Sequence, residues 1–453
     1  VNAPTVPPCA RRRPPWARRP RRPARSGPRA CAAASRPRAP GRRAASARPT
    51  CSCCARARGS PRTAGVYADV ARVEAYKQRG LQYHDICRPH WLEKEPELFW
   101  GFWGQCFNDY RCTPPHEGYA MIDRWVDRRF RHTELAQKIR QKLQASREAD
   151  GGGGEEDRPT QLPSRPYVVS DAAGGFFVFT SNVDAHHFDW FRACEIRECH
   201  GNTEIYQCTR GCQGIWRAPL DFRFLVATGT MLAPAGAPAG AAPAAEAAEG
   251  LGAAASGDGG EARPRVGNVR GGGRRTTLRH MPGSPAGAAG FETRTNHPAC
   301  PSCRGPARPA ILMFGDYGWL DLEEQDERWS AWAKAVCSAA DDARTGGRPL
   351  RVAILEVGAG GNVPTVRRTS EEQLHEFGES GAVASLIRVN PELPLGDRDE
   401  YEPTGEGADR VISIMDTGLA SLGRIDAALE ALWSAGAAEG PGQGQAGAAG
   451  RPL

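Results

Sequence analysis

The chain has 453 residues and a formal net charge of +7, with 59 Lys and Arg against 52 Asp and Glu. This charge is uneven: residues 1–64 hold 17 Arg and no Lys, Asp or Glu, which leaves 42 basic and 52 acidic residues in the rest of the chain. A uniformly basic protein is therefore excluded, and no apolar run approaches the roughly 18 residues of a membrane-spanning helix. We expect an intracellular protein, in a compartment that the sequence leaves open among nucleus, cytoplasm and organelle.

The first 64 residues consist mainly of Arg, Pro, Ala and Ser. This composition buries too little apolar surface to offset the entropy of ordering, so it predicts a disordered tail. Nucleic acid or anionic lipid is a conceivable partner for such a tail, through phosphate contacts. An organelle transit peptide is an alternative, although the prolines oppose the necessary helix. Ala, Arg, Gly and Pro all have GC-rich codons, and together with the start at Val1 this composition favours a third interpretation, a truncated or wrongly assigned start.

Helical patterns follow the tail. Aromatic and aliphatic side chains recur at helical spacing between Pro96 and Tyr110, which predicts a buried helix. A second, polar helix is predicted from about Arg124 to Ser146, and it ends before the four glycines of 151–154.

Short apolar runs, each ending at polar or glycine-rich residues, predict a set of buried strands. These runs are residues 176–179, 311–314, 352–357, 386–389 and 411–414. With helical segments between them, they predict an α/β fold with a Rossmann-like parallel sheet covered by helices on both faces. Ligands of such sheets bind beyond the carboxyl ends of the strands, where the polar clusters fall.

Low-complexity segments set the expected domain limits. Residues 233–289 are rich in Ala, Gly and Pro without periodicity, and the end of the chain is similar, so both are predicted to be flexible. We expect one globular body over residues 65–432. It should contain a small module at about 202–310 that carries the 233–289 insertion, followed by a disordered tail at 433–453.

Four cysteines form two short-spaced pairs, Cys208 with Cys212 and Cys300 with Cys303. Paired thiolates at this spacing are typical of a tetrahedral Zn²⁺ site, and four thiolates leave no open position, so the predicted zinc is structural. The 87 residues between the pairs are mostly the insertion, and closing a longer flexible loop costs little more. The alternative is four unrelated buried thiols.

Other polar residues carry little information when each is considered alone. Thr180 to Asp184 is a polar strand end, and residues 358–361 form a glycine-rich turn of a common kind. A lone histidine such as His200 is more often structural than catalytic.

The order of these elements is more informative than any one of them. Residues 177–184 (FVFTSNVD), His200-Gly201, the two cysteine pairs, 313–316 (MFGD), 356–360 (EVGAG), 363–367 (VPTVR) and 388–390 (RVN) follow one another along the chain. In sequence and order this series resembles the sirtuin family of NAD-dependent protein-lysine deacylases. The resemblance covers roughly residues 66–430, without the insertions.

The resemblance implies a large Rossmann-like domain and a small zinc domain, with NAD and an acylated lysine of a protein substrate meeting between them. It implies transfer of the acyl group from lysine to the ADP-ribose of NAD, with release of nicotinamide, and it makes His200 the catalytic base. The residues that it implies for cofactor binding are Thr180, Ser181, Asn182, Asp184, Gly358, Ala359, Gly360 and Asn390. Phe314-Gly315-Asp316 matches the turn whose backbone pairs with the substrate peptide.

Two departures accompany the resemblance. The family's opening strand with its Gly-Ala-Gly-x-Ser loop, which cradles the pyrophosphate, is not seen before Val66, and Ser181 stands where the family usually has Gln. Loss of that loop would remove phosphate-binding amides. The alternative function is therefore a catalytically impaired zinc and NAD-fold module used for interaction.

Overall fold

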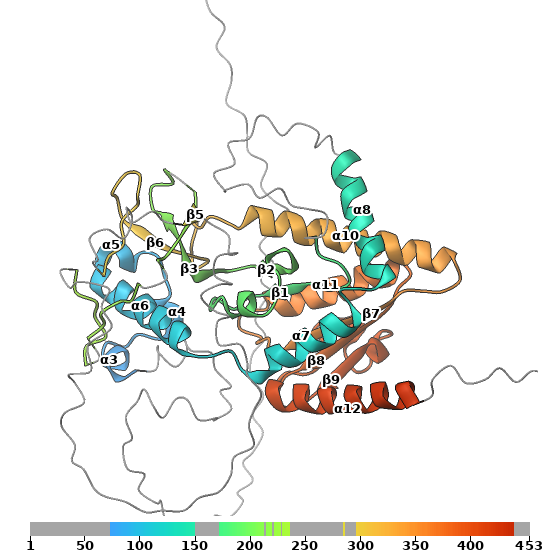
Figure 1. Ribbon diagram of the computed structural model, residues 1–453. Helices are drawn as coiled ribbons and strands as arrows, with labels where there is room; N and C mark the ends of the chain where they lie inside the picture. The colour runs from blue at the N-terminus through green and yellow to red at the C-terminus, as the bar shows by residue number, and fades with distance from the viewer. Residues whose placement is uncertain are drawn as a thin grey trace, which may run out of the picture. The chain divides into compact units, whose positions relative to one another are not determined.

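The computed structural model describes residues 73–149, 172–212, 214–219, 222–227, 229–235, 284–285 and 296–438. The predicted N-terminal tail, most of the 233–289 insertion and the last residues of the chain lie outside the described residues. Figure 1 shows the helices and strands of the described part.

The C-terminal part contains a three-stranded parallel sheet in the order β7-β8-β9. Its strands are β7 (Arg351–Val357), β8 (Val383–Val389) and β9 (Val411–Ile414), close to the predicted runs. Helix α11 (Thr365–Glu379) connects β7 to β8 and packs on both strands. This confirms the predicted mixed α/β class with parallel strands.

One face of this sheet is better covered than the other. Ala384 and Leu386 of β8 are buried in a cluster that includes Leu374 and Phe377 of α11. Val383 and Ile412 remain about half exposed, at 54% and 48%. Alternation along the strands therefore sends one set of apolar side chains into the core and leaves part of the other set in contact with solvent.

A second pair of parallel strands, β1 (Val178–Thr180) and β2 (Ile196–Glu198), forms a sheet of its own in the described part of the chain. The prediction that all the apolar runs belong to one continuous sheet is therefore wrong. Helix α10 (Glu323–Thr345) contacts β2, α8 and α11. Because α11 packs on β7 and β8, α10 connects the two parallel sheets through α11.

The small module is a four-stranded sheet in the order β5-β4-β3-β6. Its strands are β3 (Gly201–Cys208), β4 (Trp216–Arg217), β5 (Ser284–Pro285) and β6 (Ala307–Ile311). The strand predicted at 311–314 is therefore displaced: β6 ends at Ile311, and it pairs antiparallel with β3 instead of joining a parallel sheet. The position of β6 in the chain explains this pairing. The second cysteine pair lies just before β6, so β6 belongs to the small module and not to a parallel sheet.

The predicted aromatic helix is α6 (Pro96–Cys112), and short helices α3 (Glu74–Lys77), α4 (Tyr83–Ile86) and α5 (Trp91–Lys94) precede it. Proline at its first position suits a helix start, because the missing N–H has no partner there in any case. Its apolar residues belong to a core shared with β3 and the cysteine module, where Trp100 stacks on Tyr206 and Phe224.

The single polar helix predicted from Arg124 to Ser146 is wrong, because two helices occupy this region. Helix α7 spans Glu117–Arg129 and α8 spans Glu134–Ala149. Between them Arg131 is buried and pairs with Glu195, Asp123 and Asp127, and Thr133 Oγ1 accepts a hydrogen bond from the Ala136 amide at 3.1 Å as a cap of α8. A tertiary ion pair and a cap therefore interrupt a continuous helical pattern.

The last helix, α12, spans Gly418–Ala438 and extends six residues past the expected end of the body at 432. It packs on α7, where Asp426 pairs with Arg124 at 2.7 Å and accepts a hydrogen bond from Trp125 Nε1 at 2.8 Å. Arg128 lies 4.2 Å from the centroid of the Trp433 ring.

Candidate functional site

The carboxyl ends of β1 and β2 lie side by side. Thr180 pairs in register with Glu198, and the amide of Cys199 donates to the carbonyl of Thr180 at 2.9 Å. The amide of Thr203 then donates to the carbonyl of Val183 at 2.9 Å. The chain segments that carry Asn182 and His200 therefore leave the same end of one parallel strand pair, as the sequence analysis required of a common site.

The polar turn after β1 is internally organised. Thr180 is buried and its hydroxyl accepts a hydrogen bond from the Asn182 amide at 3.1 Å, while Ser181 is half-buried. Asp184 is also half-buried, and its Oδ1 accepts from the backbone amide of His186 at 2.9 Å. Asn182 is exposed, and its side chain forms a hydrogen bond with Tyr119 of α7.

His200 is half-buried in the short turn between β2 and β3. Burial lowers the pKa of its imidazole, and the nearby Arg197 guanidinium lowers it further. A neutral imidazole at neutral pH is the form that accepts a proton. Its backbone carbonyl accepts a hydrogen bond from Leu312 at 3.0 Å, which ties this turn to the end of β6.

The glycine-rich loop and Asn390 come together at the ends of β7 and β8. Gly358 adopts a positive φ of 71° and its amide donates to Val389 at 2.9 Å. The Asn390 side chain donates to the carbonyl of Ala359 at 2.8 Å. A Cβ at Gly358 or Gly360 would meet nothing within 4 Å, so open space lies above this backbone. Such space allows a ligand to approach the loop closely.

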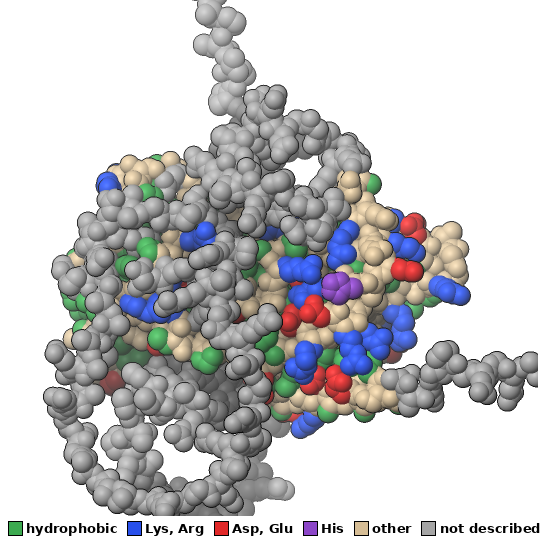
Figure 2. All heavy atoms as spheres, viewed as in Figure 1, with side chains coloured by type: hydrophobic (Ala, Val, Ile, Leu, Met, Phe, Trp, Pro, Cys, Tyr) green, Lys and Arg blue, Asp and Glu red, His purple; other side chains and the backbone are tan. Residues whose placement is uncertain are grey.

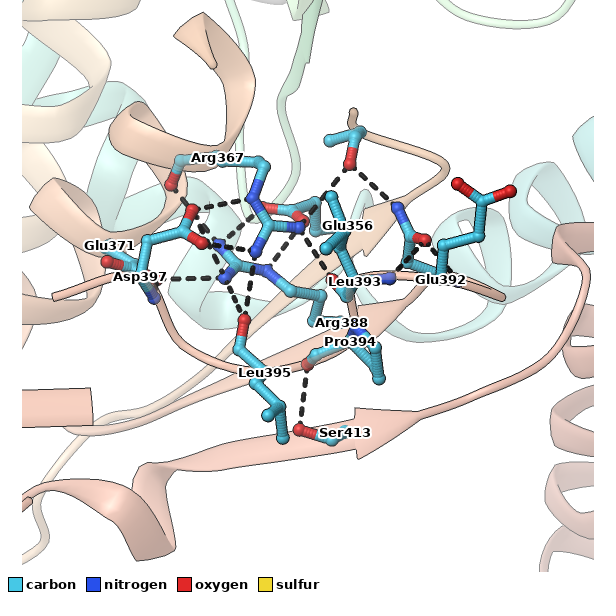
Figure 3. Close-up of polar contacts among 12 residues, drawn as sticks. Glu356, Arg367, Glu371, Arg388, Glu392, Leu393, Pro394, Leu395, Asp397 and Ser413 are labelled. Carbon is cyan, nitrogen blue, oxygen red and sulfur yellow. Dashed lines mark hydrogen bonds and ion pairs between the residues drawn. The ribbon is translucent and has the colours of Figure 1, made fainter. Parts of the chain in front are cut away.

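Beneath this loop lies a buried network of charged side chains that the sequence analysis missed (Figure 3). Arg388 of β8 is fully buried and bonds Glu371 at 2.9 Å and Glu356 at 3.0 Å. Arg367 of α11 binds the carboxylate of Asp397 through two nitrogens, each at 2.6 Å. A bidentate arginine pair of this kind fixes geometry as well as charge.

The network also supports the backbone around the loop. Arg367 donates to the carbonyls of Leu393 at 2.7 Å and Ala359 at 3.4 Å, and Arg388 donates to Leu395 at 2.7 Å. The sequence carries one signal for this network, a Glu or Arg inside an otherwise apolar strand run. Such charged residues are rarely buried unless they are paired with an opposite charge.

A pocket of about 530 Å³ opens beside this network. It is lined by Gly361, Pro364, Arg367, Arg368, Glu371, Glu372, Leu393, Asp397 and Arg398. Its lining includes none of the predicted cofactor residues, so we assign the candidate site to the strand ends and not to this pocket.

The four predicted zinc ligands converge. The Sγ atoms of Cys208, Cys212, Cys300 and Cys303 all lie within 4.8 Å of one another. The distances are 3.4 Å from Cys212 to Cys208, 3.3 Å from Cys212 to Cys300 and 3.6 Å from Cys208 to Cys303. A tetrahedron with Zn–S bonds of about 2.3 Å has S···S edges of about 3.8 Å, so the cluster has the size that zinc requires.

Backbone amides support the cluster. The amide of Arg210 donates to Cys208 Sγ at 3.3 Å, and that of Gly305 donates to Cys303 Sγ at 3.4 Å. Such bonds stabilise thiolates and orient them toward a metal. The alternative of four unrelated buried thiols is wrong.

Figure 2 shows basic and acidic side chains interspersed on the right-hand part of the viewed face, which grey atoms leave open. No helix in the described ranges has the length and apolarity to cross a membrane. The basic tail considered for nucleic acid lies outside these ranges.

Comparison with known proteins gives similarity only at the level of solved structures. No protein-family model and no curated protein matches the chain. A Sir2 homolog in complex with NAD has a TM-score of 0.35 and 11% identity, over 81% of this chain and 85% of that one. A mutant Sir2 homologue with ADP-ribose has the same score and identity, over 81% and 88%. A mutant with 2′-O-acetyl ADP-ribose also scores 0.35 at 11%, over 79% and 83%.

A TM-score of 0.35 is too low to assign a family or an activity. The similarity to sirtuins therefore rests on the motifs of this chain and on the geometry of its strand ends and cysteines.

Proposed function

We propose that the chain is an NAD-dependent protein-lysine deacylase of the sirtuin type, with a structural zinc ion. The observation that carries this proposal is the parallel pairing of β1 with β2, because it brings Asn182, Asp184 and His200 to one end of two adjacent strands. The converged cysteines support it independently, since both of their pairs belong to the same motif series.

The residues present fit the cofactor at two places. Asn182 offers an exposed amide and Asp184 a carboxylate beside β1, which suits the ribose and the carboxamide of a nicotinamide nucleotide. Gly358 and Gly360 leave their backbone open to approach, which suits the other half of the cofactor, and Asn390 holds that loop in place. When bound, NAD would supply an electrophilic ribose carbon, with nicotinamide as its leaving group.

The role of the protein is then to orient the reactants and to move one proton. His200 would accept the proton of a ribose hydroxyl, and its lowered pKa keeps the ring neutral and ready to act as a base. Asn182 and Asp184 hold the ribose in reach, which is a positioning function.

The first prediction tests the base. His200→Ala should reduce nicotinamide release from NAD and an acetylated peptide by about 10²- to 10⁴-fold, because general-base catalysis contributes that much. His84→Ala is the matched control, since His84 is an exposed histidine of α4 that lies 3.3 Å from Asp85. The measurement is nicotinamide formed per minute by the full chain with saturating peptide.

Nicotinamide release that is equal in the His200→Ala variant and the unmodified chain would exclude His200 as the base. A chain that binds zinc but releases no nicotinamide would favour the alternative, a zinc and NAD-fold interaction module.

A further inference from the structure

The Tyr119 side chain, in the first turn of α7, is held by aromatic rings on several sides. The residue is nearly buried, with 9% of its surface exposed. Its ring centroid lies 5.2 Å from that of His187 in an edge-to-face arrangement, 4.9 Å from that of His116 and 6.4 Å from that of Phe191. Ala185, in the turn after β1, belongs to the same apolar cluster. Close packing of this kind restricts the ring to one position.

The Tyr119 hydroxyl connects this cluster to the polar turn after β1. It is the only polar group of the side chain, so the hydrogen bond between the side chains of Tyr119 and Asn182 runs through it. Burial raises the pKa of Tyr119, and the nearby Asp184 carboxylate raises it further, so the hydroxyl keeps its proton at neutral pH. A buried tyrosine hydroxyl usually has a hydrogen-bond partner, and here the partner is a residue of the candidate site.

The backbone and the side chain of Asn182 are held by different groups. The Asn182 amide donates to Thr180 Oγ1 at 3.1 Å, and this bond fixes the main chain only. An exposed asparagine side chain is otherwise free to change rotamer and to turn its amide plane, because its last torsion is broad. A hydrogen bond to a rigid tyrosine restricts both motions. It uses one of the donor and acceptor positions of the carboxamide and leaves the others for a ligand.

We propose that Tyr119 is a positioning residue, whose hydroxyl holds the Asn182 carboxamide in place for the nicotinamide half of the cofactor. A group that is fixed before its ligand arrives loses less entropy on binding, which is the physical basis of preorganisation. The part of this inference that concerns the cofactor rests on the proposed function. The restraint of Asn182 by Tyr119 does not.

The competing explanation is that Asn182 only satisfies a buried hydroxyl, so that loss of the hydroxyl would cost stability and nothing else. Tyr119→Phe separates the two, since it removes the hydroxyl and keeps the ring in the cluster. Tyr76→Phe is the matched control, because Tyr76 is also buried and its hydroxyl donates to the carbonyl of Met231 at 3.3 Å, in the separate core around α6. Both variants should lose a similar amount of stability in urea unfolding.

Nitrogen NMR of the full chain with ¹⁵N-labelled asparagine tests the restraint without cofactor. The side-chain amide of Asn182 is assigned by the loss of its signal in Asn182→Ala. Its order parameter should fall below about 0.6, the flexible range, in Tyr119→Phe and stay unchanged in Tyr76→Phe. An Asn182 amide that is equally ordered in Tyr119→Phe and in the unmodified chain would overturn the proposal.

Steady-state nicotinamide release from NAD and an acetylated peptide tests the consequence. Tyr119→Phe should raise KM for NAD about five- to tenfold and leave kcat nearly unchanged, because the lost restraint acts on the ground state and the transition state alike. In the Asn182→Ala background the same change should have no further effect, since the group that Tyr119 holds is gone. Tyr76→Phe should leave KM for NAD unchanged.

An unchanged KM in Tyr119→Phe, or a rise of equal size in the Asn182→Ala background, would contradict the positioning role. If the unmodified chain releases no nicotinamide, the proposed function fails and the cofactor part of this inference fails with it. The order parameter of Asn182 still decides in that case whether Tyr119 restrains this side chain.

Discussion

Glu198, the last residue of β2, is a fully buried carboxyl group next to the candidate site. Its Oε2 accepts a hydrogen bond from Asn202 at 2.6 Å, and no hydrogen-bond partner is seen for its Oε1 among the described residues. Burial raises the pKa of this carboxyl to about 8, against the weaker opposing effect of the Asn202 hydrogen bond. Glu198 is therefore protonated at neutral pH.

This protonation predicts how stability depends on pH. The folded-state pKa lies above the unfolded value of about 4.5, so the contribution of Glu198 is fully present below about pH 4.5 and is lost as pH rises toward 8. The expected loss is about 1.4 kcal/mol per pH unit across that window. Glu198→Gln, which stays neutral, should remove this slope from urea unfolding curves measured between about pH 5 and 8. Equal slopes in the variant and the unmodified chain would show that Glu198 is ionised in the folded state.

Sequence reasoning reached some residues of the site and not others. Asn182, Asp184 and His200 were predicted from the motif series, and the strand pairing brings their segments together, while their roles stay predictions. Glu198 and His186 gave no such signal. The contacts of these residues come from distant parts of the chain, such as the Tyr110 carbonyl 76 positions away from His186, and no local pattern encodes that contact.

Among the elements, the turn from β2 into β3 has the tightest steric requirement. Gly201 has a φ of 67°, and a Cβ at this position would overlap the carbonyl oxygen of Ala310 on β6. Only glycine allows the backbone of β3 to approach β6 here. This turn also sets the direction of the adjacent His200.

Gly201→Ala should therefore destabilise the protein by about 3 kcal/mol or more, because backbone strain and a clash with main-chain atoms act together. Gly211→Ala is the matched control: Gly211 has a similar φ of 63° but open space around it, so it should cost only about 1 kcal/mol. Denaturant unfolding of both variants measures the difference. Equal losses in the two variants would mean that β3 and β6 separate easily at this point.

The boundaries of helices and strands were predictable where the periodicity of apolar residues alone decides them. The aromatic helix α6 and strand β9 lie where periodicity placed them. The break between α7 and α8 was missed, because it depends on the buried ion pair of Arg131 with Glu195, 64 residues away.

At the scale of the whole molecule, the cysteine cluster joins two segments separated by 87 residues. Zinc bound there would close the β3–β6 sheet, and the binding free energy of a structural zinc site contributes directly to folding. The small module should therefore depend on the metal.

Purified protein should contain about one zinc ion per chain, the stoichiometry of a four-thiolate site. Cys303→Ser should lower that content and increase hydrogen exchange in β3, as should a strong chelator. Cys337→Ser, on α10 and outside the cluster, is the control and should leave both unchanged. Full zinc content in Cys303→Ser would contradict the assignment of the ligands.

By itself the sequence determined the α/β class, the pairing of the four clustered cysteines and the order of the motifs, because periodicity, thiolate spacing and strand-end polarity are local properties. Only the tertiary structure decided that the parallel strands divide between two sheets, that β6 runs antiparallel beside β3, and that Glu356, Glu371, Arg367 and Arg388 form one buried network. Pairing of strands and of buried charges depends on contacts between distant residues, and the free energy of those contacts appears only once the chain has folded.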